Sequence, residues 1–487
     1  MQKIFEIKGD MFSKGLSVQT GSARGGLFRL ATGFDPFERV GFAEPSLAST
    51  ELTAPSTNPI KIITHWNDGT DQNLYAHSES KLYKYLRNSP YTRTDVTTEI
   101  DITDPSTFRN VVGAIVWKDK YIYAQSTDLR SNSLPVASGN DTQILNGATG
   151  SNLDVRKLCI GADKYLYAGD LNGVAKVTNA SGTSGNSLNA FAIDSQHTVR
   201  DLVNDGRYLV IFADNNVITT TGRLVGNYSC RVYFWDMSKA TADIIWDFPG
   251  ESYLIGARML GDAIVVFGYN GIYLCNSTTK PKMIFSFLGN STITKRPANP
   301  YQIASSPTSV YWADSGSTGQ NIYAYGSLPG SSERIFYSPY MTHGSTYAHT
   351  ALSYSAGVLF AAVDSPKFYA LNTGTTRGIL TISNTPMQLP QPYRYGFAKV
   401  VLRSKMSSGQ SVTYGAFAAD GTVISDNVTR SYSAAKPRKT LIFPIKPTTG
   451  SVSEIDDIYF NLSTDGGAIV ERIAVYGEAL EDARQTE

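Results

Sequence analysis

The chain has few of the residues on which catalytic and metal sites are usually built. Its 487 residues include 3 Cys and 5 His, and only 17% of them are charged. The cysteines are odd in number, lack a C-x-x-C spacing and lie in or beside apolar stretches, so we expect Cys159, Cys230 and Cys275 to be buried free thiols. The formal net charge of +1 excludes the long-range positive field of a protein that grips many phosphates.

Long apolar runs are also missing. No stretch approaches the roughly 18 apolar residues of a membrane-spanning helix, and the N-terminal sequence MQKIFEIKGDMFSKG lacks the continuous apolar core of a signal peptide. We therefore expect no membrane span and synthesis in a cytoplasm. Low charge together with 42 Gly and 29 Tyr predicts an all-β chain of short strands and many turns, and excludes a coiled coil or a long helix.

An internal repeat is present instead. An aromatic residue followed by Ala or Gly recurs at intervals of 44 to 55 residues, close to the length of a four-stranded propeller blade. The repeated pairs are Tyr75-Ala76, Tyr123-Ala124, Tyr167-Ala168, Phe212-Ala213, Phe267-Gly268, Trp312-Ala313 and Phe360-Ala361. Each pair follows another apolar strand and a polar turn, as in Asp205-Gly206, and most are followed by a third strand.

This pattern predicts a β-propeller of about seven blades. Because strand residues alternate between faces, the aromatic residue would fill the space between blades, and the small residue would permit close approach on the other face. The alternative is a set of seven generic hairpins in a sandwich. The second unit is the weakest: we expect residues 126–154 to form mainly a long exposed loop, with only Thr142 to Leu145 strand-like.

Two flanking regions lie outside the repeat, so we predict three parts. These are an extended N-terminal arm (1–58), a propeller (59–386) and a C-terminal β-sandwich with an acidic tail (387–487). The sandwich strands are expected at Phe397–Leu402, Ser411–Phe417, Lys439–Ile445, Ile455–Leu462 and Ile469–Tyr476. The segment from Val40 to Ala43 is a candidate to close the last blade. Residues 390–442 are basic and the residues after them acidic, which favours contact with a complementary surface.

Signatures of chemistry are missing. The sequence has no G-x-S-x-G, H-E-x-x-H, phosphate-binding loop or dinucleotide fingerprint. His65 and His77 flank the first hairpin, and His343 and His349 are close in sequence, but no further ligand stands at zinc spacing. We therefore expect no metal, no cofactor and no catalytic residue, and we interpret the chain as a non-enzyme.

Two weaker sets of candidate residues remain. A glycosidase-like pair of carboxylates near the propeller axis could come from Asp201, Asp205, Asp262 and Asp314, although turn chemistry explains such residues equally well. Calcium could be held by oxygens of Asp68, Thr70, Asp71 and Asn73, although their spacing is not that of a known calcium loop, and a solvated turn is favoured.

Three short N-terminal segments accompany this architecture: Lys8 to Leu16 (KGDMFSKGL), Leu27 to Leu30 and Gly33 to Phe37. Together they resemble virion proteins of tailed bacteriophages, above all the β-propeller tail nozzle proteins of short-tailed phages. The resemblance implies a structural, homo-oligomeric ring or nozzle of the tail through which DNA is retained and ejected. It implies portal, adaptor, and tail fibre or needle proteins as neighbours, passing contact with DNA in a lumen, and a place in the virion after assembly in the host cytoplasm. It transfers no functional residue.

Two other functions compete with this interpretation. A carbohydrate- or receptor-binding module of the virion would use exposed loop aromatics, for which Tyr340, Tyr347 and Tyr393 are the candidates. An enzyme acting on glycans would need the carboxylate pair described above. Strand aromatics such as Tyr75, Tyr123 and Trp312 are expected in the core.

Overall fold

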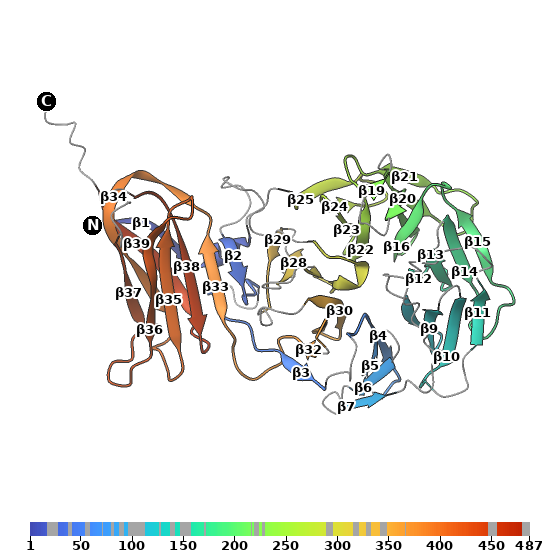
Figure 1. Ribbon diagram of the computed structural model, residues 1–487, viewed down its shortest axis with the longest axis horizontal. Coiled ribbons are helices and arrows are strands. Elements are labelled where there is room, and N and C mark those ends of the chain that lie inside the picture. The colour runs from blue at the N-terminus through green and yellow to red at the C-terminus, as the bar shows by residue number, and fades with distance from the viewer. Residues whose placement is uncertain are drawn as a thin grey trace.

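The chain folds into a β-propeller and a β-sandwich that lie side by side (Figure 1). The computed structural model describes residues 1–16, 28–37, 41–53, 59–70, 72–78, 82–86, 92–95, 113–125, 128–136, 142–146, 157–169, 172–215, 217–218, 224–225, 229–288, 296–314, 321–327, 333–340, 348–365, 367–446 and 455–479. In these residues no helix is long and apolar enough to cross a membrane. The helical segments described are the short 3-10 helices η1 (Asp10–Lys14) and η3 (Pro300–Gln302).

Seven four-stranded antiparallel sheets form the propeller, as the repeat predicts. The first three blades, each given from its inner to its outer strand, are β4 (Ile62–Asn67), β5 (Gln72–His77), β6 (Leu82–Leu86) and β7 (Thr92–Asp95); β8 (Ala114–Trp117), β9 (Lys120–Gln125), β10 (Asp128–Ser133) and β11 (Thr142–Asn146); β12 (Leu158–Ile160), β13 (Leu166–Gly169), β14 (Gly173–Val177) and β15 (Ser187–Ala192).

The next three blades follow the same order in space. They are β16 (Thr198–Asn204), β17 (Leu209–Asp214), β20 (Cys230–Trp235) and β21 (Ile244–Asp247); β22 (Leu254–Leu260), β23 (Ala263–Gly268), β24 (Gly271–Cys275) and β25 (Lys282–Ser286); β26 (Ile303–Ser305), β27 (Ser309–Ala313), β28 (Ile322–Ser327) and β29 (Arg334–Tyr337). A small hairpin, β18 (Val217–Ile218) with β19 (Leu224–Val225), is inserted in blade four. Each inner strand contacts the inner strands of the neighbouring blades, and the ring is closed.

Blade seven is completed by a strand from the beginning of the chain. From the innermost outward, its first three strands are β30 (His349–Ser355), β31 (Val358–Val363) and β32 (Phe368–Ala370). Its outer strand is β3 (Thr50–Leu52), which is antiparallel to β32. The segment expected to close the blade, Val40 to Ala43, lies about ten residues earlier. Ala43 pairs with Val470 of the sandwich, and Val40 lies outside the described residues. Closure by the N-terminal segment was therefore predicted correctly, but its position was not.

Large aromatic residues fill the space between blades, as predicted. Tyr75 of blade one packs against Tyr121 of blade two, with ring centroids 5.6 Å apart. Phe267 of blade five packs against Trp312 of blade six at 5.4 Å. The small residue that follows also has the expected role at Gly268, where an added Cβ would lie 2.3 Å from the buried carboxylate of Glu251. The repeated pair of an aromatic and a small residue therefore marks positions where neighbouring blades pack together.

The second blade differs from its prediction. Residues 126–154 were expected to be mainly a loop, but β10 pairs with β9 along its whole length and with β11 on its other side. The strand was not predicted because Asp128–Ser133 contains only one apolar residue, Leu129, and such a polar sequence is typical of a loop. Ser131 is nevertheless buried, and its hydroxyl donates to the Ala180 carbonyl of blade three at 2.7 Å.

Two facing sheets make up the C-terminal sandwich. One contains β1 (Gln2–Lys8), β39 (Val470–Ala479), β34 (Met387–Leu402) and β37 (Thr440–Ile445), and the other β2 (Phe28–Thr32), β33 (Leu380–Asn384), β38 (Ile455–Asp465), β35 (Ser411–Phe417) and β36 (Val423–Ser431). The first residues of β34 pair with β38 and join the sheets at one corner. The five predicted strands are all present. The sandwich also takes β33, which lies before residue 387, together with β1 and β2 from the segment expected to be an arm.

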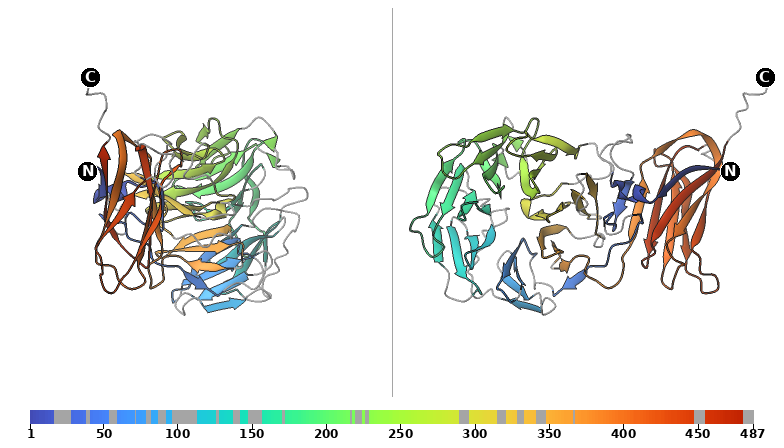
Figure 2. Two further views of the ribbon diagram at one scale, coloured as in Figure 1. Left: turned by 60° about the vertical axis from the view of Figure 1, so that its left-hand side comes forward. Right: turned by 180° about the vertical axis from the view of Figure 1, so that it is seen from behind.

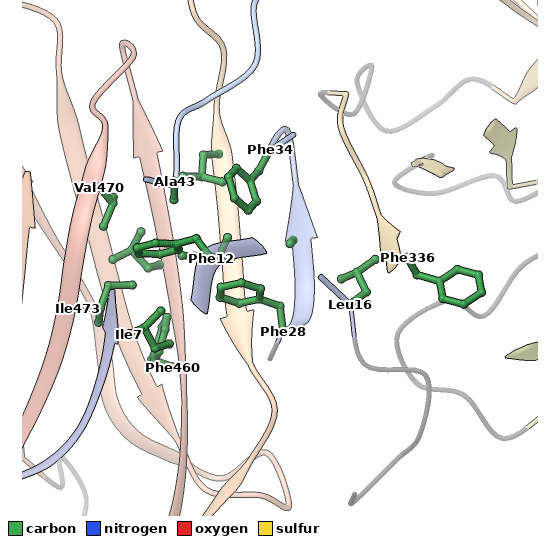
Figure 3. Packing of buried hydrophobic residues seen from close by; sticks show 14 of the residues in the cluster. Ile7, Phe12, Leu16, Phe28, Phe34, Ala43, Phe336, Phe460, Val470 and Ile473 are labelled. Atoms are coloured by element: carbon green, nitrogen blue, oxygen red, sulfur yellow. The ribbon is translucent and has the colours of Figure 1, made fainter. Parts of the chain in front are cut away.

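The N-terminal segment packs between the two units (Figure 2). Phe12 and Phe28 lie against the sandwich, while the Leu16 amide donates to the Phe336 carbonyl of blade six at 2.7 Å (Figure 3). These side chains belong to one hydrophobic cluster that runs from the sandwich core, through the N-terminal segment, into blades five and six. The segment is extended, as expected, but it is built into both units.

Candidate functional site

Four polar side chains from consecutive blades gather near the inner strands of the propeller, and we call them the inner-strand cluster. Lys157 directly precedes β12 of blade three, Asp201 lies in β16 of blade four, Arg258 lies in β22 of blade five, and Tyr301 lies in η3 just before blade six. Each comes from the innermost strand of its blade or from the residues just before that strand, so the packing of blades three to six brings the four together. Lys157 and Asp201 are each 4% exposed.

Asp201 is held by hydrogen bonds on both carboxylate oxygens. Its Oδ2 accepts from Arg258 Nη1 at 3.0 Å and from the Ala257 amide at 2.9 Å, and its Oδ1 accepts from the Leu202 amide at 3.0 Å. The Arg258 guanidinium also donates from Nε to the Ile303 carbonyl at 3.0 Å. A buried ion pair needs such additional bonds to offset its desolvation. This pair therefore links blades four, five and six.

Lys157 has a different environment. Its Nζ lies 3.5 Å from the centroid of the Tyr301 ring, a cation–π contact, and the described residues give it no ion pair within 4.0 Å. Burial lowers the pKa of Lys157 to about 7, an effect that the Asp201 charge partly offsets. Burial likewise raises the pKa of Tyr301. The charge of the Lys157 amine therefore changes near neutral pH.

A second buried carboxylate, Glu251, stabilises the junction between blades four and five. Its Oε1 accepts from the Ser252 amide at 2.7 Å and the Asn270 amide at 3.0 Å, while Oε2 accepts from the Tyr273 hydroxyl at 3.0 Å. Burial raises the pKa of Glu251 despite these bonds. The sequence analysis did not select this residue; its only signal was a Pro-Gly-Glu turn between two apolar strands.

The four candidate carboxylates occupy different environments. Asp201 is the buried residue described above, and Asp314, directly after β27, is buried as well. Asp205 closes a turn, where its Oδ1 accepts from the Arg207 and Tyr208 amides at 2.9 and 2.6 Å. Asp262 is an exposed turn residue 3.6 Å from Arg334. Turn chemistry accounts for Asp205 and Asp262, and a structural ion pair accounts for Asp201.

The histidines of the first hairpin do not face one another. His65 lies opposite Leu74 and His77 opposite Ile62 in the β4–β5 register. His65 Nε2 shares a hydrogen bond with the Ser353 hydroxyl of blade seven, and His77 Nδ1 lies 3.2 Å from the Tyr121 hydroxyl of blade two. Burial lowers the pKa of His77 to about 4. His349 lies in β30, and His343 falls outside the described residues.

Other candidate positions are also explained by structure. Asp68 accepts from the Thr70 amide at 2.8 Å and from Asn73 at 3.1 Å, which forms a turn; Asp71 falls outside the described residues. Across the described part of the chain, no three His, Cys, Asp or Glu residues are grouped so that they could hold a metal ion. All three cysteines are free; Cys230 and Cys275 are buried and Cys159 is half-buried, and burial raises the thiol pKa of Cys159 and Cys275 to about 12.

Two of the three loop aromatics expected at the surface are packed instead. Tyr340 lies against Tyr311, with ring centroids 6.0 Å apart, and burial raises its pKa well above the usual value. Tyr393 is 1% exposed within β34, and its hydroxyl accepts from the Gln2 side chain at 2.8 Å. Tyr347 falls outside the described residues. Tyr75, Tyr123 and Trp312 are core residues, as expected.

Positive charge gathers on the sandwich. Two adjacent loops at its lower end in Figure 1, residues 403–410 and 432–439, carry five exposed cations, and we call them the basic loops. The cations are Arg403, Lys405, Lys436, Arg438 and Lys439. These residues belong to the basic half of the sandwich noted in the sequence.

The similarities to known proteins concern the fold. No family model and no curated protein matches the chain. Among solved structures, Kuenenia stuttgartiensis hydrazine synthase is similar at 12% identity and a TM-score of 0.46, over 65% of this chain and 96% of that one. The Myceliophteria thermophila Cps50 (Swd1) β-propeller domain is similar at 9% identity and 0.44, over 68% and 100%. The Neurospora crassa Pan2 WD40 domain is similar at 10% identity and 0.43, over 68% and 98%, and at such identities the likeness is one of fold alone.

Proposed function

We propose that the chain is a structural virion protein of a tailed phage, a subunit of a tail ring or nozzle through which DNA is retained and ejected. The observation that carries the proposal is the N-terminal segment, which joins the propeller and the sandwich through backbone pairing. β1 and β2 extend the two sheets of the sandwich, and β3 completes blade seven. Propeller and sandwich are thereby joined at several points along one segment.

Further contacts strengthen this connection. The Gly33 amide donates to the Tyr340 carbonyl at 3.2 Å, and the Ala43 amide donates to the Val470 carbonyl at 2.9 Å. Buried Glu44 forms an ion pair with Arg377, on the connection between blade seven and the sandwich. Independent domains usually meet through small polar interfaces and move relative to each other. A shared hydrophobic cluster, and one segment that contributes strands to sheets of both units, favour a unit that keeps its shape under load, as a conduit for DNA requires.

The polar groups support a role without catalysis. Asp201, Glu251 and His77 each have protein partners that position them between blades, so these groups act as structural connections. A near-neutral chain also suits a lumen in which DNA must slide, because dense phosphate contacts would retain it. The alternative, a carbohydrate- or receptor-binding module, draws less support because Tyr340 and Tyr393 are packed in the structure.

The proposal extends to partners and location. A ring of identical subunits needs a heterologous interface, in which one surface meets a different surface of the next copy. Portal, adaptor, and tail fibre or needle proteins are the proposed neighbours, DNA passes through the lumen, and the protein resides in the virion after assembly in the host cytoplasm.

Oligomeric mass tests the proposal. We expect light scattering of the full-length chain at several concentrations to give one fixed multiple of the 53.0 kDa subunit, and electron micrographs to show rings. Removing residues 1–58 is not a suitable comparison, because the deletion also removes β1, β2 and β3. A chain that stays monomeric at every concentration, forms no rings and binds defined sugars on a glycan array would overturn the proposal in favour of the alternative.

A further inference from the structure

The basic loops are fixed to each other by backbone hydrogen bonds. The Leu402 amide donates to the Lys439 carbonyl at 2.8 Å, and the Met406 amide donates to the Arg438 carbonyl at 3.0 Å. Met406 itself is 4% exposed and belongs to the sandwich core. The loops therefore present their side chains from a rigid base, which reduces the entropy lost when a partner binds.

Most of the charge in the basic loops is uncompensated. Neither loop contains an acidic residue. Lys439 lies 3.4 Å from Glu471, and Arg403 lies over the Phe42 ring at 5.1 Å. In the described residues Lys405, Lys436 and Arg438 form no ion pair within 4.0 Å. Three like charges are thus held in one exposed region, and no acidic group of the described residues lies within ion-pair distance of them.

Two acidic residues at the same end of the sandwich leave the balance positive, because they stand against five cations. Asp465, at the end of β38 beside the start of β35, accepts from the Gly466 amide at 2.7 Å. Glu471 is already engaged with Lys439. A partner that approaches the basic loops therefore meets a net positive surface.

The remaining chemistry of the loops distinguishes between classes of anionic partner. Their other exposed residues are small or polar, including Ser404, Ser407, Ser408 and Ser433. The centre of a protein–protein interface is depleted of Lys and Ser and enriched in aromatic residues, Met and Arg, of which the loops expose only Arg403 and Arg438. Contacts to a nucleic-acid backbone, in contrast, come from Lys, Arg, Ser and backbone amides. The composition therefore favours phosphates over an acidic protein surface.

We propose that the basic loops bind the phosphate backbone of double-stranded DNA without sequence preference. Base-specific reading places side chains in the major groove on a helix or a two-stranded ribbon, and stacking on single strands needs exposed aromatic rings. The loops offer neither, because they contain no helix or strand and because Tyr432, their only aromatic residue, is half-buried. The inference rests on the proposed function for its choice of DNA and names the surface that contacts it. Because the loops offer only five cations, we expect the binding to be weak, and because it is electrostatic it falls as salt rises; weak contacts of this kind permit sliding.

The experiment compares two variants of the full-length chain with equal changes in charge. The first is Lys405→Ser, Lys436→Ser and Arg438→Ser in the basic loops. The second, a control on exposed propeller positions, is Lys280→Ser, Lys282→Ser and Arg207→Ser. Binding to a fluorescent 30-base-pair duplex is measured by anisotropy between about 25 and 150 mM salt. Circular dichroism of each variant establishes that it is folded.

We expect the basic-loop variant to lose affinity at least tenfold at the lowest salt. Its slope of log affinity against log salt should fall by about 2.7, since each lost phosphate contact contributes about 0.9. The control variant should match the wild type. Equal losses in both variants, no loss in the basic-loop variant, or no binding by the wild type at the lowest salt would each overturn the inference.

Two added measurements separate this inference from the proposed function. An unlabelled polyglutamate peptide that displaces the duplex at equal charge concentration would show a general anion surface and overturn the assignment to DNA. Light scattering on the same samples reports ring formation independently. If the protein forms rings but does not bind DNA, only the inference about the basic loops is overturned. If it binds DNA but stays monomeric, only the proposed ring is overturned.

Discussion

Leu52 lies directly opposite Phe368, so the outer strand of the last blade comes from the opposite end of the propeller sequence. The neighbouring side chains Glu51 and Lys367, which are 316 residues apart, are joined by a 3.1 Å hydrogen bond. The loop entropy lost in closing so long a segment must be recovered by contacts made only after the ring has formed. The three residues of β3 are therefore a point of vulnerability for the whole propeller.

Leu52→Ala tests the importance of this closure. Leu52 is 4% exposed among the apolar residues of blades one and seven, so we expect its truncation to lower the free energy of unfolding by about 2–4 kcal/mol. Urea unfolding followed by tryptophan fluorescence measures the change. Glu51→Ala is the matched control; its ion pair is exposed, so the change should stay below about 1 kcal/mol. Equal effects of the two substitutions would contradict closure by β3.

Asp201→Ala tests the ion pair that links three blades. Removing the carboxylate leaves the Arg258 guanidinium without its charge partner and leaves the Ala257 amide without an acceptor. We expect a loss of about 2–3 kcal/mol, below the roughly 3–5 kcal/mol of a fully buried lone charge, because the Arg258 side chain is 24% exposed. Asp262→Ala, at an exposed ion pair of 3.6 Å, should change stability by less than about 1 kcal/mol.

A glycan-cleaving enzyme would respond differently at Asp201. If the residue were a catalytic acid or base, Asp201→Asn would abolish hydrolysis of a bound sugar while leaving stability nearly intact. We expect the reverse, a clear loss of stability and no hydrolytic activity to lose. Thermal unfolding and a reducing-sugar assay on wild type and variant distinguish the two outcomes.

Lys157 gives the protein a pH dependence on the alkaline side. Its folded pKa of about 7 lies below the roughly 10.4 of an unfolded lysine. Between these values the unfolded chain binds the proton and the folded chain does not. Stability therefore rises with pH across this window, by up to about 1.4 kcal/mol per pH unit.

Lys157→Met isolates this contribution. The variant should be more stable than the wild type near pH 7, and the difference should shrink steadily toward pH 10 as the wild type loses its desolvation penalty. Urea unfolding at pH 7, 8, 9 and 10 measures it. Lys446→Met, at an exposed lysine, should run parallel to the wild type. A constant difference between Lys157→Met and wild type would show that Lys157 is charged in the folded protein throughout.

Local patterns in the sequence predicted most of the architecture. The pair Tyr75-Ala76 and its six equivalents mark the second strand of each blade because alternation and close approach are properties of a few neighbouring residues. The sandwich strands were found in the same way. In contrast, β10 was missed because its buried positions include Ser131, whose partner Ala180 lies in the next blade. Polarity predicts exposure only where such a partner is lacking.

The sites were harder to predict because their members are distant in sequence. Asp201 was a candidate, but Arg258, 57 residues away, becomes its partner only through the packing of adjacent blades. Lys157 stands in the sequence VRKLCI (residues 155–160), and its position directly before the apolar Leu158–Ile160 was the one available signal. The excess of basic residues in 390–442 was visible, but their gathering depends on the pairing between Met406 and Arg438.

His77 gives a second pH dependence, on the acid side. Its folded pKa of about 4 lies below the 6.5 of an unfolded histidine because the ring is buried between blades one and two. As the pH falls below 6.5, His77 becomes protonated in the unfolded chain, whereas in the folded chain it stays neutral until about pH 4. Stability is therefore lost between pH 6.5 and 4, by about 3 kcal/mol in total, and this contribution is constant above 6.5.

In the wild type the Tyr121 hydroxyl lies 3.2 Å from His77 Nδ1. His77→Gln removes the titration but keeps a side chain that can form a hydrogen bond with this hydroxyl. We expect the variant to be somewhat less stable than the wild type at pH 7 and to gain on it as the pH falls to 4. Tyr121→Phe is the control: it removes the same hydrogen bond, costs about 1 kcal/mol and keeps the slope of the wild type, because His77 stays buried. Unfolding midpoints in urea at half-unit steps from pH 7 to 4 compare the three proteins. If wild type and His77→Gln lost stability in parallel, the acid sensitivity would have to come from groups other than the histidine between the blades.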